Sequence, residues 1–120
     1  MTRGQSAGCA ARIVALEPAS SAFLSTGVGG AHRVEGIGAG MAPPLLTQGT
    51  YDEVRAIEED DGRETARRMA REEGIFAGVS SGLNVAAALR LAKELGPGKI
   101  VATVACDTGL KYLAGDLYEA

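Results

Sequence analysis

The stretch that decides the fold is residues 75–105, IFAGVSSGLNVAAALRLAKELGPGKIVATVA. The brief apolar segment 75–78 is typical of a strand, and a helix is predicted over residues 80–95. That helix is apolar nearly all round, which indicates burial on most of its sides. Glycine and proline at 96–98 end it, and the hydrophobic run at 100–105 is of the kind found in parallel sheets. The stretch therefore predicts a strand–helix–strand unit.

The segments before residue 75 continue this alternation. A short apolar strand is predicted over residues 12–18, where Pro18 stops it. A second strand is predicted over 52–57, and a helix over 64–73, with Gly74 as its C-terminal stop. Strands that alternate with helices predict an α/β fold with a mostly parallel sheet flanked by helices in three layers.

Composition and charge exclude several classes of partner. The 120 residues are 46% hydrophobic and 22% charged, and the formal net charge of −3 argues against nucleic acid or an anionic membrane held by bulk charge. No apolar run reaches the ~18 residues of a membrane span, and residues 1–11 lack the apolar core of a secretory signal. Cys9 and Cys106 form no C-x-x-C or zinc-binding spacing, which suits a reducing compartment. We expect a cytoplasmic protein.

The sharpest local motif is Gly78-Val79-Ser80-Ser81-Gly82, at the predicted strand-to-helix turn. It matches G-x-S-x-G, the nucleophile turn of α/β-hydrolases, but that chemistry needs a histidine after the serine. The only histidine, His32, comes before it, which disfavours a serine hydrolase. Alternatively, a hydroxyl at a helix N-terminus suits a phosphate or a heterocyclic nitrogen. The structural alternative is that Ser80 or Ser81 simply caps the helix.

A second glycine-rich motif, residues 36–40, lies in a long loop over 26–50. It looks like a dinucleotide fingerprint, but it neither follows a clear strand nor opens a helix, so the nucleotide interpretation fails. A flexible loop that exposes its backbone is the expectation. We interpret His32 as a solvated loop residue and the acidic cluster 58–61 as a helix-end feature, since no cation-ligand spacing accompanies it.

Taken together in chain order, these motifs are more specific than any one alone. The segments occur in the order Val14-Ala15-Leu16-Glu17-Pro18, Glu35-Gly36-Ile37-Gly38-Ala39-Gly40, Glu64-Thr65-Ala66-Arg67-Arg68, Glu72-Glu73-Gly74-Ile75, Gly78-Val79-Ser80-Ser81-Gly82 and Asp107-Thr108-Gly109-Leu110-Lys111-Tyr112-Leu113. This string resembles the C-terminal part of cysteine synthase (O-acetylserine sulfhydrylase) and its cystathionine β-synthase relatives, which are fold-type II pyridoxal-phosphate enzymes. The resemblance covers roughly residues 13–117.

The resemblance implies a cofactor-binding role for Ser80 and a substrate-binding role for Gly36. Ser80 is expected to hydrogen-bond the pyridine nitrogen of pyridoxal phosphate. A neutral hydroxyl at a helix N-terminus does not stabilise a protonated ring nitrogen, which favours β-elimination and β-replacement over transamination. The loop that starts at Gly36 is expected to contact an amino-acid substrate through its backbone. Cys106 stands where many relatives carry proline, and its role is left open.

The departures from the family are as informative. Its Schiff-base lysine and phosphate-binding loop lie earlier in the chain and have no counterpart here; none of Lys93, Lys99 and Lys111 matches the lysine motif. We therefore expect an unmatched segment over 1–11 and, over 12–120, the C-terminal part of a large domain. Such a fragment is expected to be inactive alone and to form a homo-oligomer or join a complementary N-terminal half. The alternative is a non-catalytic, self-associating remnant.

Overall fold

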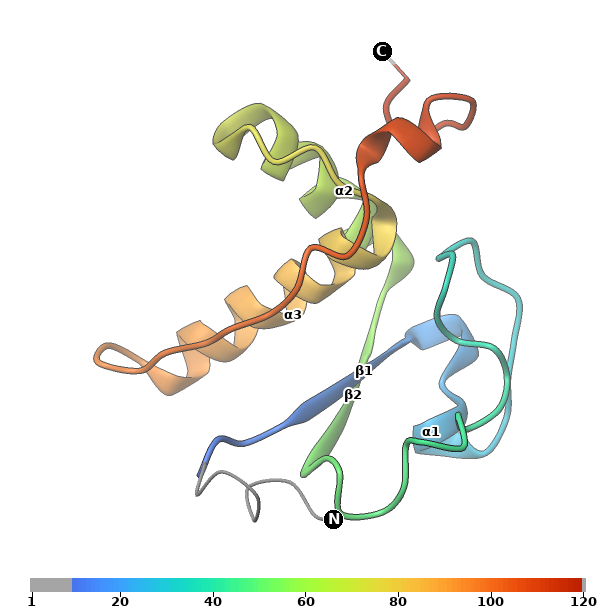
Figure 1. The fold of residues 1–120 in the computed structure, drawn as a ribbon, viewed down its shortest axis with the longest axis vertical. Coiled ribbons are helices and arrows are strands. Elements are labelled where there is room, and N and C mark those ends of the chain that lie inside the picture. Colours follow the sequence, from blue (N-terminus) through green and yellow to red (C-terminus); the bar gives the residue numbers. More distant parts are fainter. Residues whose placement is uncertain (1–9, 120) are drawn as a thin grey trace.

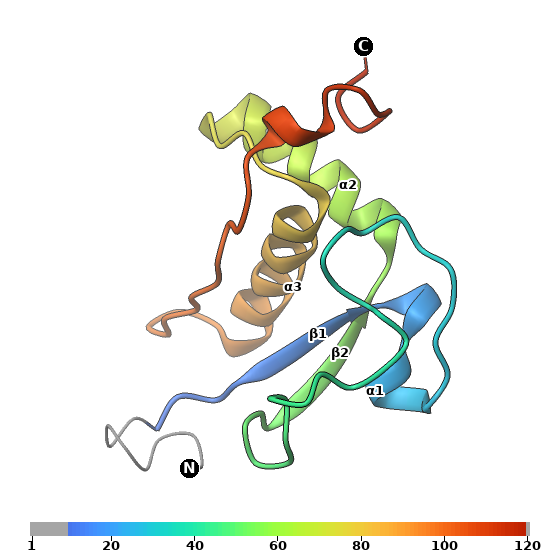
Figure 2. The same ribbon diagram turned by 45° about the vertical axis from the view of Figure 1, so that its right-hand side comes forward.

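The computed structural model describes residues 10–119 (Figure 1). Two strands, β1 (Val14–Pro18) and β2 (Glu53–Ile57), pair in parallel, with Val14 beside Glu53 and Pro18 beside Ile57. The helices are α1 (Phe23–Thr26), α2 (Glu59–Arg68) and α3 (Val79–Leu95), and α1 and α3 lie on opposite sides of the strand pair in both views (Figures 1 and 2). The predicted α/β fold with a parallel sheet and flanking helices is confirmed.

Residues 1–9 are not described, so most of the unmatched segment expected over 1–11, including Cys9, lies outside the described residues. Within residues 10–119, no helix combines the length and the apolar character that a membrane crossing requires.

The end of β1 is fixed by a buried carboxylate. Glu17 is 3% exposed, and its two oxygens accept hydrogen bonds from the backbone N–H groups of Leu24 (2.7 Å) and Ser25 (2.9 Å). These donors belong to α1, so the charge of Glu17 is compensated at the N-terminal half of that short helix. Pro18 then ends the strand because it has no N–H to donate.

Helix α2 begins at Glu59, five residues before the predicted start. Its first turn carries Glu59, Asp60 and Asp61, and its last turn carries two arginines, which complements the helix dipole at both ends. A π-helical turn (Met69–Glu73) follows, and Gly74 ends it with φ +69°, as predicted. The start was placed too late because a glycine at position 62 weakens an isolated helix.

In the folded chain, Gly62 lies at the point where α2 and α3 contact each other. A Cβ on Gly82 would lie 2.0 Å from the carbonyl oxygen of Gly62 and 2.8 Å from Ala66. A Cβ on Gly62 would in turn lie 3.1–3.2 Å from Leu83. The two helix backbones therefore approach too closely for side chains at these positions. The core forms around this crossing, from Val34, Ile57, Ala66, Val79, Leu83, Ala86, Ala87 and Leu117.

The strand predicted over 100–105 is wrong. These residues follow α3 as an extended segment without a ladder, held by a hydrogen bond from Asn84 Nδ2 to the Val104 carbonyl oxygen (2.9 Å) (Figure 1). Ile100 is 95% exposed and Val104 63% exposed. A strand needs a neighbour for its backbone groups, and no strand of residues 10–119 lies beside this segment.

The strand predicted over 75–78 is also wrong. Only Ala77 forms a bridge, a single antiparallel one with Thr108, and the N–H of Gly109 donates to the Phe76 carbonyl oxygen at 2.9 Å. The segment between the two helices is too short for a strand, because Gly74 ends one helix and α3 already begins at Val79.

The described chain is more open than a compact domain of its size. Its accessible surface is 7598 Å², against about 6,100 Å² expected for a 12.3 kDa monomer. Its radius of gyration is 15.0 Å, whereas a compact domain of 120 residues is expected to have about 13.6 Å. An apolar cavity of about 670 Å³ lies between β1, the second half of α3 and residues 99–103. Apolar surface that would normally be covered is therefore open.

The helix crossing makes a stability prediction. Gly82→Ala inserts a methyl group against the Gly62 carbonyl, so α2 must shift, and we expect a loss of about 1–3 kcal/mol in the free energy of unfolding. Urea unfolding followed by circular dichroism measures it. The control is Gly115→Ala, whose new Cβ would meet only the Tyr112 carbonyl oxygen, at 3.7 Å. Equal stability of the two variants would contradict the close crossing.

Candidate functional site

The N-terminus of α3 is capped by glycine, not by serine. Gly78 is the N-cap, with φ −86° and ψ −178°, and no side chain caps the helix. Ser80 and Ser81 lie inside the first turn, so the alternative in which one of them is the capping residue is wrong. A Cβ at Gly78 would lie 2.4 Å from the Tyr112 ring and 2.7 Å from Asp107 Oδ1. Glycine is therefore required here by a close approach of the C-terminal segment.

The two serines have different surroundings. Ser81 is fully buried, and its Oγ accepts the backbone N–H of Cys106 at 3.0 Å. This bond fixes the start of the segment that runs on to Tyr112. Ser80 is 8% exposed, and among residues 10–119 its hydroxyl has no hydrogen-bond partner. Ser81 thus serves the fold, while Ser80 presents a hydroxyl that can bind something else.

Ser80 and Gly36 line the same cavity, of about 320 Å³. Three separate parts of the chain build this cavity. They are the long loop over residues 26–50 that contains the glycine-rich motif (the glycine loop), the first turns of α3 and the segment after residue 105. The sequence alone singled out Ser80, Gly36 and Cys106. It missed the remaining polar groups, although the Asp-Thr-Gly segment was part of the family resemblance. The lining residues are Glu35, Gly36, Ile37, Ser80, Asn84, Cys106, Asp107, Lys111 and Tyr112.

One wall of the cavity carries a coupled acid and phenol. The Tyr112 hydroxyl donates to Asp107 Oδ2 at 2.5 Å, and Lys111 Nζ lies 3.7 Å from the same oxygen. Burial, reinforced by the bond to Asp107, raises the pKa of Tyr112 well above its usual range. Tyr112 is therefore a neutral donor at physiological pH. Asp107 Oδ1 is buried without a hydrogen-bond partner among the described residues.

His32 is not a free loop residue. It is half-buried, and both ring nitrogens contact the backbone: Nδ1 accepts the N–H of Val34 at 3.0 Å, and Nε2 lies 2.8 Å from the Gly38 carbonyl oxygen. The expectation of a solvated side chain is wrong. Since neither nitrogen is free to take a proton from Ser80, a serine hydrolase is disfavoured further.

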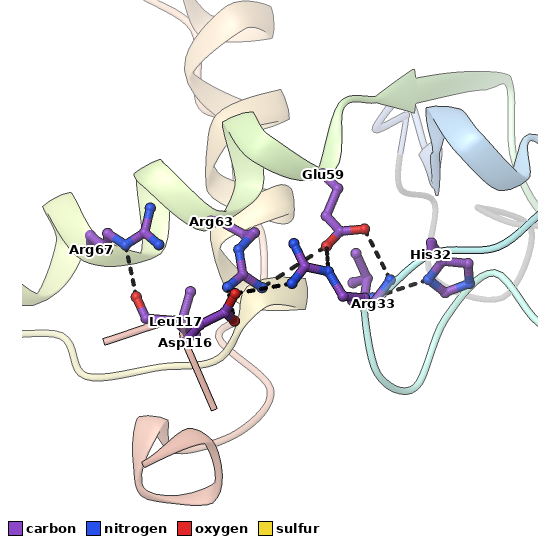
Figure 3. A network of polar contacts seen from close by, with 8 residues as sticks. His32, Arg33, Glu59, Arg63, Arg67, Asp116 and Leu117 are labelled. Carbon is purple, nitrogen blue, oxygen red and sulfur yellow. Dashed lines mark hydrogen bonds and ion pairs between the residues drawn. The ribbon is translucent and has the colours of Figure 1, made fainter. Parts of the chain in front are cut away.

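A polar network ties the glycine loop to α2 and to the C-terminal segment (Figure 3). The backbone N–H of Arg33 donates to Glu59 (2.9 Å), and its guanidinium contacts Asp116 (3.0 Å). Arg63 contacts the other oxygen of Asp116, and Arg67 Nε donates to the Leu117 carbonyl oxygen (2.7 Å). Three regions distant in sequence are thereby held together around α2.

Two carboxylates of the acidic cluster form ion pairs with arginines of other segments. Glu59 pairs with Arg33, and Asp61 pairs with Arg90 of α3. Among residues 10–119 no group of three or more metal-ligating side chains comes together. The interpretation of residues 58–61 as a helix-end feature agrees with these ion pairs.

A comparison with protein families settles the relationship. The model of the pyridoxal-phosphate dependent enzymes matches residues 2–107. The chain belongs to this family. Its relatives in the pyridoxal-phosphate family include cysteine synthase of Staphylococcus aureus, 47% identical over 106 residues, which are 88% of this chain and 34% of the relative. A probable cysteine synthase of Bacillus subtilis is 46% identical over 103 residues, 86% of this chain and 33% of the relative.

Solved structures of family members agree with the fold. Cysteine synthase of Entamoeba histolytica superimposes with a TM-score of 0.82 at 34% identity, over 89% of this chain and 32% of that one. The O-acetylserine dependent cystathionine β-synthase of Helicobacter pylori gives 0.84 at 34% identity, over 92% and 36%. The chain thus spans about a third of the length of the relatives it matches.

The network around Asp116 makes a pH prediction. Hydrogen bonds from Arg63 and then Arg33 lower the pKa of Asp116 below its ordinary 3.8. A lowered folded-state pKa gives stability that is complete above pH 3.8 and is lost as the pH falls through the folded value. Asp116→Asn should therefore lower the midpoint of thermal unfolding at pH 7, and the difference from wild type should vanish in acid.

Thermal unfolding at a series of pH values checks this. Glu119→Gln, which removes an exposed carboxylate with no ion pair among the described residues, is the control and should leave the midpoint unchanged at pH 7. A deficit of Asp116→Asn that does not diminish at all as the pH falls from 7 into the acid range would show that charge is not the cause.

Proposed function

We propose that residues 12–120 form the C-terminal part of the large domain of a cytoplasmic, pyridoxal-phosphate dependent β-replacement enzyme similar to cysteine synthase, which makes cysteine from O-acetylserine and sulfide. The observation that carries this proposal is the unpaired Ser80 hydroxyl at the N-terminus of α3, in a cavity that Gly36 also lines. Membership of the family and the 47% identity to cysteine synthase support it.

The residues present fit the cofactor ring. When bound, pyridoxal phosphate supplies an electron sink, which stabilises the negative charge that develops on a carbon of the amino-acid substrate when a bond to it breaks. Ser80 would donate its hydroxyl hydrogen to the pyridine nitrogen. The positive end of the α3 dipole disfavours a proton on that nitrogen, and a neutral hydroxyl does nothing to restore it. Such a ring is a weaker sink, which suits β-replacement.

The glycine loop would meet the small amino-acid substrate. Gly36 has φ +83° and nothing within 4 Å of the position a Cβ would occupy, so its backbone is open to a ligand. Backbone N–H groups in such a loop can donate to the oxygens of a bound amino acid. Substrate recognition would thus rest on main-chain groups.

A complementary N-terminal half would complete the site. Lys111 is the one lysine lining the Ser80 cavity, its ammonium faces Asp107, and it does not match the family's Schiff-base lysine motif. The accessible surface exceeds that of a compact monomer by about 1,500 Å², more than the ~800 Å² per partner of a standard interface. We propose that a complementary N-terminal half, called the complementary chain below because it can be supplied separately, carries the Schiff-base lysine and phosphate loop.

A second candidate is a non-catalytic, self-associating protein. It is favoured by the unpaired apolar run 100–105, with Ile100 95% exposed, which offers a backbone edge and side chains to another copy. The two candidates differ in what covers this run. The complementary chain predicts a hetero-assembly, whereas the second predicts a stable homo-oligomer that ignores added partner.

The chain alone should not capture the cofactor covalently. Pure protein mixed with pyridoxal phosphate is expected to show no Schiff-base absorbance beyond that of the Lys111→Arg variant, because Lys111 is held toward a carboxylate. Borohydride reduction and peptide mass spectrometry measure labelling at each lysine. Stoichiometric labelling at one lysine, with turnover of O-acetylserine, would overturn the expectation of inactivity.

Assembly of the chain with a complementary chain should restore turnover, and that turnover should depend on Ser80. The chain is mixed with the first two-thirds of the Staphylococcus aureus relative, made separately. We expect a hetero-assembly by sedimentation, cofactor absorbance and turnover. Ser80→Asp should lower turnover about tenfold or more, since a carboxylate favours the protonated ring.

The matched control is Ala92→Asp, which adds a carboxylate on the exposed face of the same helix. Unchanged kinetics in Ser80→Asp would remove Ser80 from the cofactor site. A well-behaved monomer that does not respond to the added partner would refute both candidates.

A further inference from the structure

We propose that His32 is a positioning residue for the substrate loop, holding the backbone of residues 36–38 in the shape that faces the Ser80 cavity. This rests on the proposed function, since it takes the loop at Gly36 as the substrate-binding element. The role follows from what each ring nitrogen contacts.

The hydrogen bonds fix the ring's tautomer. The Val34 backbone N–H lies 3.0 Å from Nδ1 and can only donate, so Nδ1 must be an unprotonated acceptor. The proton of the neutral ring is then on Nε2, where it donates to the Gly38 carbonyl oxygen at 2.8 Å. His32 thus joins the start of the loop to its far side through one rigid ring.

The Gly38 carbonyl is the point that is held. It accepts a second hydrogen bond from the Ser21 hydroxyl (3.2 Å), and Ser21 Oγ itself accepts the N–H of Gly30 (3.1 Å). Ser21 is 1% exposed and ends the short 3-10 turn (Ala19–Ser21) that follows β1, so this bond ties the loop to the end of that strand. Gly38 has φ +63°, and a Cβ there would lie 2.6 Å from His32 Nε2. A side chain at position 38 would therefore clash with the His32 ring, so the His32–Gly38 hydrogen bond requires glycine at this position.

The base of the loop is anchored independently. Arg33, next to His32, is bound to Glu59 of α2 through its backbone N–H and to Asp116 through its side chain (Figure 3). Gly36, in contrast, has open space around it. A fixed base and an open tip leave the shape of residues 36–38 to the two hydrogen bonds on the Gly38 carbonyl oxygen, of which His32 makes the shorter, 2.8 Å against 3.2 Å for Ser21.

Two variants separate the two ring contacts. His32→Asn keeps an acceptor near Val34 through its side-chain oxygen, and loses the donor to Gly38. His32→Gln reaches farther and keeps an amide donor for Gly38, and loses the acceptor at Nδ1. If the Gly38 bond sets the loop, Asn should damage it and Gln should largely rescue it. Gln48→Asn, at an exposed position of the same long loop, is the control.

The first measurement uses the full chain alone. In the ¹H–¹⁵N spectrum of the labelled protein, a ring Nε2–H proton protected from exchange is expected in wild type. The heteronuclear NOE of the Ile37, Gly38 and Ala39 amides should fall in His32→Asn and stay near the wild-type value in His32→Gln and Gln48→Asn, because only the first variant loses the donor to the Gly38 carbonyl oxygen. An absent ring N–H signal, with equal NOE values in all variants, would overturn the proposal that His32 holds the loop.

The second measurement uses the hetero-assembly described above. His32→Asn should raise KM for O-acetylserine about tenfold, leave cofactor absorbance unchanged and keep kcat within about threefold. A more mobile loop with unchanged KM would overturn the positioning role. An assembly that binds no cofactor would instead refute the proposed function, and the mobility of the loop in the chain alone would still decide whether His32 holds it.

Discussion

The close approach of the α2 and α3 backbones is the constraint on which the rest of the structure depends. Gly82 lies where a single methyl group would come within 2.0 Å of the Gly62 carbonyl oxygen. This contact sets where α3 begins relative to α2, and it sets the direction in which the first turn of α3 faces. The buried aliphatic residues pack around it, because small residues at a crossing let neighbouring side chains meet.

The same crossing separates two adjacent serines into a structural and a functional one. Ser81 faces inward and holds the Cys106 N–H, which places the segment from Asp107 to Tyr112 beside Gly78. Ser80, one residue earlier, faces the cavity. Since successive helix positions differ by about 100° in direction, one serine cannot take the other's role without a shift of the helix.

The polar network around α2 fixes the position of the glycine loop. Arg33 and Arg63 both reach Asp116, so the loop and the C-terminal segment are fixed to one helix. The site is thus assembled from parts that each have an anchor elsewhere. The apolar run 100–105 is held by one side-chain hydrogen bond, from Asn84 to Val104, but Ile100 and Val104 are uncovered, and this agrees with a chain that spans about a third of its relatives.

The sequence by itself determined the elements whose cause is local. The first strand ends at Pro18, the helix before Gly74 ends at that glycine, and the apolar helix lies in the Gly-Val-Ser-Ser-Gly segment and the residues after it, as predicted; the start of the helix before Gly74 was predicted five residues too late. These ends depend on residues within a few positions of one another. The order of the motifs along the chain also indicated the family, and through it Ser80 and Gly36 as candidate site residues.

Only the tertiary structure decided what depends on distant neighbours. It showed that residues 100–105 lie exposed and unpaired, because backbone pairing needs a partner strand that periodicity cannot report. It brought Lys111, Tyr112 and Asp107 to the Ser80 cavity and gave His32 two backbone partners. Hydrogen bonds and close contacts between segments far apart in the chain leave no pattern in the local sequence, so they emerge only when the chain is folded.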